Sequence, residues 1–172
     1  MALSQLVEDI KAAHHENFIV DMKLANDINI ITMQSNYMKT VIHEHASSLQ
    51  SDTMEGVLSE PDWNGTLDIH ITSQFDQVIQ RWVPVLISIM FGRSKKDFAE
   101  HWSKLLECYP TDSWEEFEKT FPGVTVDWSD ALGLSFLDTI QAAFPDVSAE
   151  TKFSFLRKFC LSLCARNGHS QW

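Results

Sequence analysis

Basic residues are scarce in this chain of 172 residues, which has 13 Lys and Arg against 24 Asp and Glu, a formal net charge of −11. Because proteins contact nucleic-acid phosphates mainly through Lys and Arg, this balance argues against a free-standing nucleic-acid binder. Cysteine is also rare: Cys108, Cys160 and Cys164 cannot all pair with one another and form no disulfide framework. We therefore expect a reducing compartment, either the cytosol or the nucleus.

Long apolar runs are missing as well. The most apolar stretch, residues 82–91, is much shorter than the roughly 20 residues that cross a bilayer. The first nine residues lack the basic region and apolar run of a secretory signal, so no membrane partner is expected. Aromatic side chains, by contrast, are abundant, with 6 Trp and 11 Phe. The composition is therefore that of a folded acidic domain rather than a disordered chain.

The first 50 residues carry two helical patterns. Apolar residues recur at three- and four-residue spacing over residues 3–14 and again over residues 33–46. The first set is Leu3, Leu6, Val7, Ile10 and Ala13, and the second is Met33, Tyr37, Met38, Val41 and Ile42. Two brief apolar runs between them are of uncertain type, and residues 47–53 are polar enough for a linker. We predict a helical N-terminal extension over residues 1–50 and a main domain over residues 51–172.

Strand and helix patterns alternate in the main domain. Strands are expected over residues 54–59, 66–73, 80–90 and 124–128, and helices over 94–108, 113–121 and 130–144 and after Ser148. In the second strand, apolar Leu67, Ile69 and Ile71 alternate with polar Asp68, His70 and Thr72. This alternation predicts a half-buried strand, with the apolar residues on the core side and the polar residues on the solvent side.

Two local signals fix details of these elements. Pro84 lies inside the third strand, where it indicates a bulge or an edge position. Ser94 followed by Asp97 predicts a capping box at the start of the next helix. The strand order predicts an antiparallel meander and a fourth strand added through a helical crossover. The result is an α/β mixed sheet flanked by helices. This order of strands and helices matches the ribonuclease-H-like pattern, although other α+β folds have the same order.

Two segments carry motifs in the order found in one enzyme family. The first is the strand Gln80 to Ser88, followed by Gly92 and a helix with Phe98, His101, Leu105 and Leu106. The second is the strand ending in Asp127, then Ala131, Ile140, Phe144 and Pro145, and finally the block Cys160 to Asn167. Together they resemble the Mutator-like (MULE) transposases over roughly residues 26–167.

The resemblance implies a metal-dependent chemistry. Such transposases are similar to other enzymes with a ribonuclease-H-like core, in which an Asp-Asp-Glu set holds two divalent metal ions for DNA cleavage and strand transfer. Two metals can stabilise both the attacking and the leaving oxygen, and carboxylate oxygens suit Mg²⁺. The resemblance therefore implies Mg²⁺ or Mn²⁺ as the cofactor, DNA as the partner and the nucleus as the location.

This chain matches the catalytic set unevenly. The first acid corresponds to Glu60, with Asp62 as the neighbouring alternative, and the second to Asp127, which would bind Mg²⁺. Leu163 stands where the family has the His of a Cys-x-x-His block. The family's third acid lies well beyond that block, and the chain ends at Trp172. We therefore expect a truncated or degenerate transposase-derived fragment without catalytic activity.

Each candidate also has an ordinary structural interpretation. Asp127 is well placed to start the following helix, and Glu60 and Asp62 are typical solvated loop acids. Cys160, Cys164 and His169 could hold zinc with three ligands, but free cysteines are commonly small buried residues. The basic cluster Arg93, Lys95 and Lys96 is either a solvated helix cap or a DNA contact.

Two further functional hypotheses remain open. An incomplete sheet exposes an edge strand and apolar surface, which favours a non-catalytic protein-interaction module or self-association through that edge. The second hypothesis is that the chain is an unrelated small α/β protein and that the order of its motifs is accidental.

Overall fold

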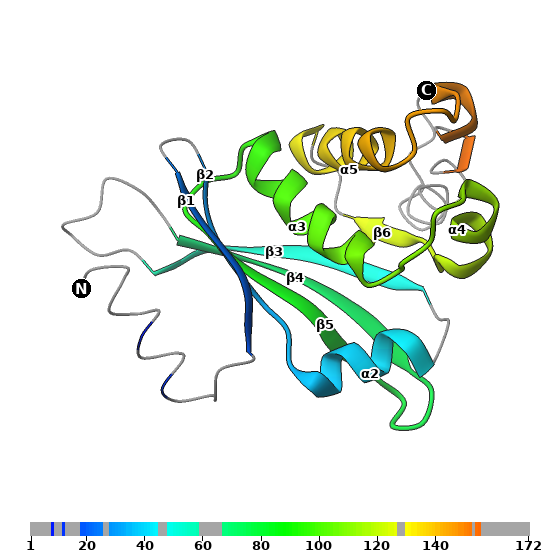
Figure 1. The fold of residues 1–172 in the computed structure, drawn as a ribbon. Coiled ribbons are helices and arrows are strands. Elements are labelled where there is room, and N and C mark those ends of the chain that lie inside the picture. The colour runs from blue at the N-terminus through cyan, green and yellow to red at the C-terminus, as the bar shows by residue number, and fades with distance from the viewer. Residues whose placement is uncertain are drawn as a thin grey trace, which may run out of the picture.

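The computed structural model describes Glu8, Ala12 and residues 18–25, 28–44, 48–58, 67–126, 130–152 and 154–155. Six strands form one sheet: β1 (Ile19–Ala25), β2 (Ile28–Met33), β3 (Leu49–Leu58), β4 (Leu67–Asp76), β5 (Arg81–Met90) and β6 (Val124–Val126). The helices are α2 (Asn36–Glu44), α3 (Lys95–Glu107), α4 (Trp114–Thr120) and α5 (Asp130–Ala143) (Figure 1). Of the helices in these ranges, none is both long and apolar enough to span a membrane.

The sheet is mixed, with strand order β1-β2-β5-β4-β3-β6. All neighbouring pairs are antiparallel except β3 and β6, which run parallel. Strands β3, β4 and β5 are the predicted meander, and β6 joins β3 after the crossover through α3 and α4. The α/β architecture with a mixed sheet flanked by helices is thus confirmed.

Residues 19–33 correct the expectation of a helical N-terminal extension. They form the β1–β2 hairpin, and β2 pairs with β5 from Ile30 opposite Met90 to Met33 opposite Ile87. Their β-branched residues, mostly isoleucine, pack well on a pleated surface. Of the two predicted helices in this region, the described residues confirm only the second, as Asn36–Glu44. The sheet contains strands from both sides of residue 50, so the predicted boundary between an extension and a main domain runs through a single sheet. Residues 3–14 lie outside the described residues, except for Glu8 and Ala12.

The polar segment predicted as a linker is also a strand. β3 begins at Leu49, which is fully buried, and Ser51 is buried two residues later. After Leu49, the buried side of this strand carries polar Ser51 and Thr53, so no hydrophobic alternation marks its first half.

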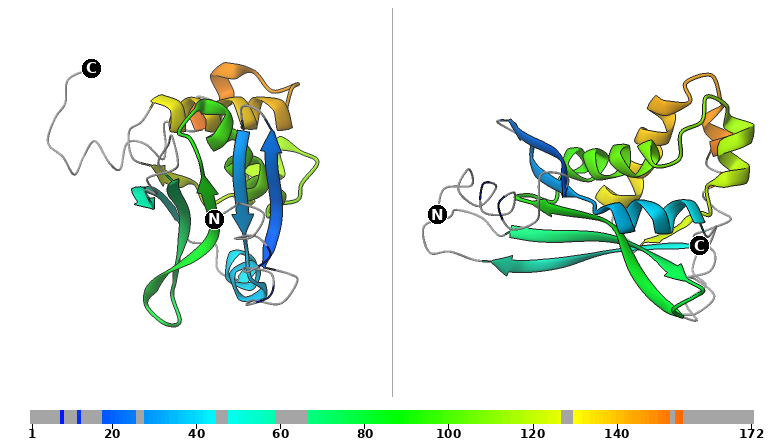
Figure 2. Two further views of the ribbon diagram at one scale, coloured as in Figure 1. Left: turned by 90° about the vertical axis from the view of Figure 1, so that its left-hand side faces the viewer. Right: turned by 60° about the horizontal axis from the view of Figure 1, so that its bottom comes forward.

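Helices cover one face of the sheet. α3 lies on the sheet and α5 packs on the far side of α3 (Figures 1 and 2), where Trp102 Nε1 donates to the Leu132 carbonyl and Ser135 Oγ at 3.2 and 3.1 Å. α2 packs further along the same face, and Gln74 Nε2 there donates to the Val41 carbonyl at 3.1 Å. We call this the helix-covered face.

The predicted faces of β4 are correct for Leu67, which is buried, and wrong for the rest of the strand. Asp68, His70 and Thr72 are buried on the helix-covered face, whereas Ile69 and Ile71 are half-buried on the opposite side. Polar residues are tolerated beneath α3 because their side chains hydrogen-bond one another, and a buried polar group is costly only when it lacks a partner. We call the opposite side the open face. Its apolar residues on β3, β4 and β5 include buried Leu67 together with Met54, Ile69, Ile71, Phe75, Trp82, Pro84, Ile87 and Ile89.

The main core lies between the helix-covered face and the helices and is largely aromatic. Its buried aromatic residues are Phe98, Trp102, Trp114, Phe117, Phe121, Phe136 and Phe155. Trp and Phe side chains therefore supply a large share of the described core. On α5, Leu132 and Phe136 face the core and are buried, whereas Leu134 is exposed.

The local signals around α3 and β5 are confirmed. Ser94 Oγ accepts from the backbone of Asp97, whose carboxylate accepts from the backbone of Ser94, so the capping box is complete. The register of β5 against β4 shifts beside Pro84, where Ser73 pairs with Pro84 and Thr72 with Leu86. Val85 is the extra residue, which is the bulge that Pro84 predicts.

Candidate functional site

The predicted catalytic and metal-binding residues all lie outside the described part of the chain. This holds for Glu60, Asp62, Asp127, Cys160, Cys164 and His169, whose proposed roles stay predictions. Among the residues that are described, no group of three or more His, Cys, Asp or Glu side chains is arranged to hold a metal ion.

The register of β3 bears on the expected pairing of Glu60 with Asp127. Val126, directly before Asp127, pairs with Ser51 near the start of β3. Leu58, two residues before Glu60, lies further along β3, and its partner Leu67 is five residues from Thr72, the partner of Ser51, or about 17 Å away at a rise of ~3.3 Å per residue. The acid of β3 that follows Ser51 is Asp52, which is exposed on the open face. The last described residue of β6, Val126, is therefore paired next to Asp52, a residue that the sequence interpretation placed in a linker.

The predicted basic cluster is engaged with carboxylates. Arg93 Nε lies 3.0 Å from Oδ2 of buried Asp68, and Arg93 also pairs with Glu55. Asp68 accepts in addition from the backbone of Gly56 at 2.7 Å, where φ is +61°, a conformation that favours glycine. Lys95 pairs with Asp138 on α5 at 2.5 Å. Two of the three cations in the cluster thus bind this chain's own acids.

A chain of seven hydrogen-bonded side chains crosses the sheet beneath α3. It starts at Thr53, whose Oγ1 lies 2.7 Å from His70 Nδ1, and His70 Nε2 lies 2.9 Å from Ser51 Oγ. Ser51 and Thr72 are 2.8 Å apart, and Thr72 lies 2.8 Å from His101 Nε2 on α3.

The second histidine continues the chain to the other side of the sheet. His101 Nδ1 lies 2.8 Å from Ser88 Oγ, which is 3.1 Å from Thr32 Oγ1. The members come from β2, β3, β4, β5 and α3, and the two imidazole rings are 4.4 Å apart between centroids. Sequence reasoning missed this network, because its members look like the solvated side of separate strands.

Burial keeps both imidazoles neutral. Desolvation lowers the pKa of His70 from 6.5 to about 4, although the nearby Asp52 carboxylate opposes that shift. Desolvation, followed by the neighbouring His70, lowers the pKa of His101 well below 6.5. A neutral imidazole donates from one nitrogen and accepts at the other, which fits a continuous chain of hydroxyl groups.

The hydroxyl–imidazole distances in the network match those of nucleophile–base pairs, but the groups are not accessible to a substrate. Ser51 with His70 and Ser88 with His101 lie within the 2.6–3.2 Å at which a base activates a nucleophile. All four residues are at most 2 % exposed, and both nitrogens of each ring face hydroxyl groups rather than an orienting carboxylate. The arrangement fixes α3 on the sheet and offers no entry for a substrate.

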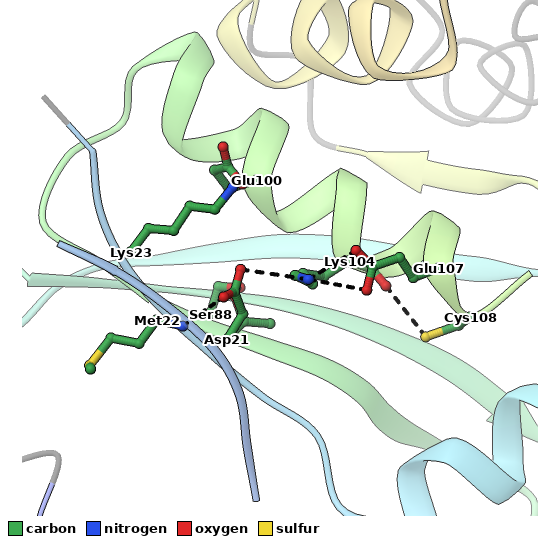
Figure 3. Close-up of polar contacts among 9 residues, drawn as sticks. Asp21, Met22, Lys23, Ser88, Glu100, Lys104, Glu107 and Cys108 are labelled. Carbon is green, nitrogen blue, oxygen red and sulfur yellow. Dashed lines mark hydrogen bonds and ion pairs between the residues drawn. The ribbon is translucent and has the colours of Figure 1, made fainter. Parts of the chain in front are cut away.

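An open crevice of about 240 Å³ lies at the end of α3, lined by Val20, Gln34, Lys39, Leu86, Lys104, Glu107 and Cys108. Figure 3 shows Lys104 between Asp21 of β1 and Glu107, with Nζ 3.7 Å and 2.9 Å from their carboxylates. The hydrogen bond to Glu107 and the charge of Asp21 raise the pKa of Lys104. Together with the Lys23–Glu100 pair, these contacts attach β1 to α3.

The thiol in this crevice is not an activated nucleophile. Burial raises the pKa of Cys108, which outweighs the hydrogen bond from Gln34, and reactive cysteines have lowered values. The crevice therefore holds paired charges and a neutral thiol, an arrangement typical of a structural contact.

The turn of the β4–β5 hairpin is the most apolar exposed element of the described chain. Val78 is 74 % exposed, Ile79 48 % and Trp82 47 %, and the Trp82 ring packs edge-on against Phe75 at 5.7 Å. Figure 2 shows this turn at one extremity of the molecule, beyond α2. We call these four residues the hairpin tip.

The comparisons with known proteins assign no family to this geometry. A scan against protein-family models, a search of curated proteins and a search of solved structures each found no significant match to the chain.

Proposed function

We propose that this chain is a non-catalytic protein-interaction domain whose contact surface is the hairpin tip, and that the tip binds a second copy of the chain. The observation that carries the proposal is the exposure of Val78, Ile79 and Trp82 on one projecting turn. Tryptophan is enriched among the residues that dominate binding energies at protein interfaces.

The choice of residues in this turn has no local structural cause. Tight turns favour Gly, Asn, Asp, Ser and Pro, because these residues adopt or stabilise turn conformations. Val78 and Ile79 have none of these properties, and Gln80 has a φ of 55° without being glycine. Exposed apolar residues on a strained turn are explained when a partner covers them.

Charge favours a protein partner over a membrane or DNA. A net charge of −11 repels both phosphate backbones and anionic lipid surfaces. The tip itself has little charge, since Asp76 is buried and accepts from the backbone of Val78 and Ile79, leaving Arg81 exposed. Two tips can therefore meet about a two-fold axis, as symmetric dimers do, without placing like carboxylates together.

Sedimentation velocity over a series of protein concentrations tests this proposal. The chain is expected to dimerise with increasing concentration, and Val78→Asp and Trp82→Asp are each expected to weaken dimerisation at least tenfold. Leu134→Asp on α5 is the matched control, since Leu134 is 49 % exposed and lies away from the tip. A monomer at all concentrations, or equal effects of all three variants, would contradict the proposal.

The proposal also implies that the chain lacks the DNA-cleaving activity that the transposase resemblance suggests. The order β5-β4-β3-β6, with β6 parallel to β3, supports a ribonuclease-H-like sheet, and descent from a Mutator-like transposase stays a prediction from the sequence motifs. We expect no nicking of supercoiled plasmid in Mg²⁺ or Mn²⁺. Nicking that disappears in Asp127→Ala would show that the chain is an active nuclease.

A further inference from the structure

The turn of the β4–β5 hairpin has an inverted pattern of burial, in which the acid is buried and the apolar residues are exposed. Asp76 ends β4 and is 6 % exposed, whereas Val78, two residues later, is 74 % exposed. Carboxylates are mostly found in water, and a turn that only reverses the chain has no need to bury one. The burial of Asp76 therefore calls for a separate explanation.

Asp76 fixes the backbone of this turn. Its Oδ1 accepts from the backbone N–H groups of Val78 at 2.8 Å and Ile79 at 3.2 Å, as an Asp does when it caps a turn or the start of a helix. Asp76 is itself paired with Arg81, the first residue of β5. The backbone of the two exposed apolar residues is thus attached to the end of the sheet.

Gln80 fixes the turn from its other end. Its φ of 55° is a left-handed conformation that is uncommon for residues other than glycine, asparagine and aspartate. Its side-chain Nε2 donates to the carbonyl of Gln77 at 2.6 Å. Glycine would adopt this conformation without strain, but it has no side chain to make that hydrogen bond. The turn therefore carries a strained residue that adds a third anchoring contact.

We propose that Asp76 and Gln80 are positioning residues for self-association, which hold the turn in one conformation before the second copy of the chain binds. This inference rests on the proposed function of the hairpin tip. Ordering a loop during binding costs free energy, and a turn that is already ordered avoids this cost. Val78 and Ile79 supply the apolar contact, and the two polar residues determine how that contact is presented.

Sedimentation velocity and amide hydrogen exchange by NMR, both on the full chain, test the positioning role. Asp76→Ala removes the acceptor and leaves every apolar side chain of the tip in place. It is expected to weaken dimerisation at least fivefold. At concentrations where the chain is monomeric, it is also expected to speed the exchange of the Val78 and Ile79 amides at least fivefold. Asp76→Asn keeps an oxygen acceptor and is the matched control, expected to change both quantities less than twofold.

The amides of Ile87 and Ile89, which lie on β5 between β2 and β4, show whether Asp76→Ala stays folded. If they also exchange faster, Gln80→Gly replaces this variant, because glycine accepts the backbone conformation and removes only the bond to Gln77. It is expected to weaken dimerisation at least threefold.

Two kinds of failure are distinguishable. A wild-type chain that stays monomeric at all concentrations contradicts the proposed function and the positioning role together. A wild-type dimer that neither Asp76→Ala nor Gln80→Gly weakens, or that Asp76→Asn weakens as much as Asp76→Ala does, contradicts the positioning role alone.

Discussion

Lowering the pH from 7 to 4 is expected to remove at least about 3 kcal/mol from the free energy of unfolding. The pKa of His70 falls from 6.5 to about 4 on folding, and each pKa unit is equivalent to about 1.4 kcal/mol. His101 adds to this loss, because burial lowers its pKa in the same direction. Typical domains have only about 5–15 kcal/mol of stability, so the loss is large.

The sign follows from which state binds more protons. Both histidines have lower pKa values in the folded chain than in the unfolded chain, so between pH 6.5 and about 4 the unfolded chain takes up protons that the folded chain does not. Stability is therefore complete above pH 6.5 and decreases as the pH falls toward 4.

Urea unfolding at several pH values measures this effect. In this window His70 contributes up to about 1.4 kcal/mol per pH unit to the slope of stability against pH, and His101 adds to the slope in the same direction. His70→Gln keeps a hydrogen-bonding side chain that does not titrate, and it is expected to lower the slope by about 1.4 kcal/mol per pH unit. An unchanged slope in this variant would show that His70 does not titrate as described.

Trp102→Ala is expected to destabilise the chain by about 3–5 kcal/mol, the usual range for removing a buried aromatic residue. Trp102 is 0 % exposed, lies 4.8 Å from Phe136 between ring centroids, and donates to both Leu132 and Ser135 on α5. The variant leaves a cavity between α3 and α5 and removes the polar contacts that join the two helices.

Thermal and urea unfolding measure this loss against a matched control. Trp82→Ala removes the same side chain from the exposed hairpin tip, and for the monomer it is expected to change stability by about 0.5 kcal/mol or less, as ordinary surface substitutions do. If Trp102→Ala and Trp82→Ala destabilise the monomer equally, Trp102 does not hold α5 on α3.

Elements with strong local signals could be predicted from the sequence. The capping box of Ser94 and Asp97 defines the start of α3, and Pro84 marks the bulge in β5. These signals depend only on residues close in the chain, which is why they are readable without knowledge of the partner strands.

Elements whose residues depend on distant partners could not be predicted. β1 and β2 are short, and their place in the sheet is set by the edge of β5, which no local pattern reveals. The faces of β4 were reversed, because alternation shows that two faces differ but not which face the helices cover. His70 and Thr72 become buried only because Ser51 and His101, from other elements, supply their hydrogen bonds.

The same limit applies to candidate sites. The hairpin tip consists of ordinary apolar residues at strand positions, and only the projection of the turn makes them a surface. The position of Asp52 beside the end of β6 follows from the parallel register, which a one-dimensional pattern does not contain. The motif-based carboxylates Glu60, Asp62 and Asp127 lie outside the described residues.

The parallel pairing of β3 with β6 has a consequence for the order of folding. β3, β4 and β5 meet through antiparallel pairings between consecutive strands, whereas β6 reaches β3 only after β4, β5, α3 and α4 have been traversed. Contacts that close long loops require more chain entropy to be lost before they form. The meander is therefore expected to form first and β6 to pair with β3 late. A folding intermediate without β6 would expose the unpaired edge of β3, which could pair with a strand of another chain.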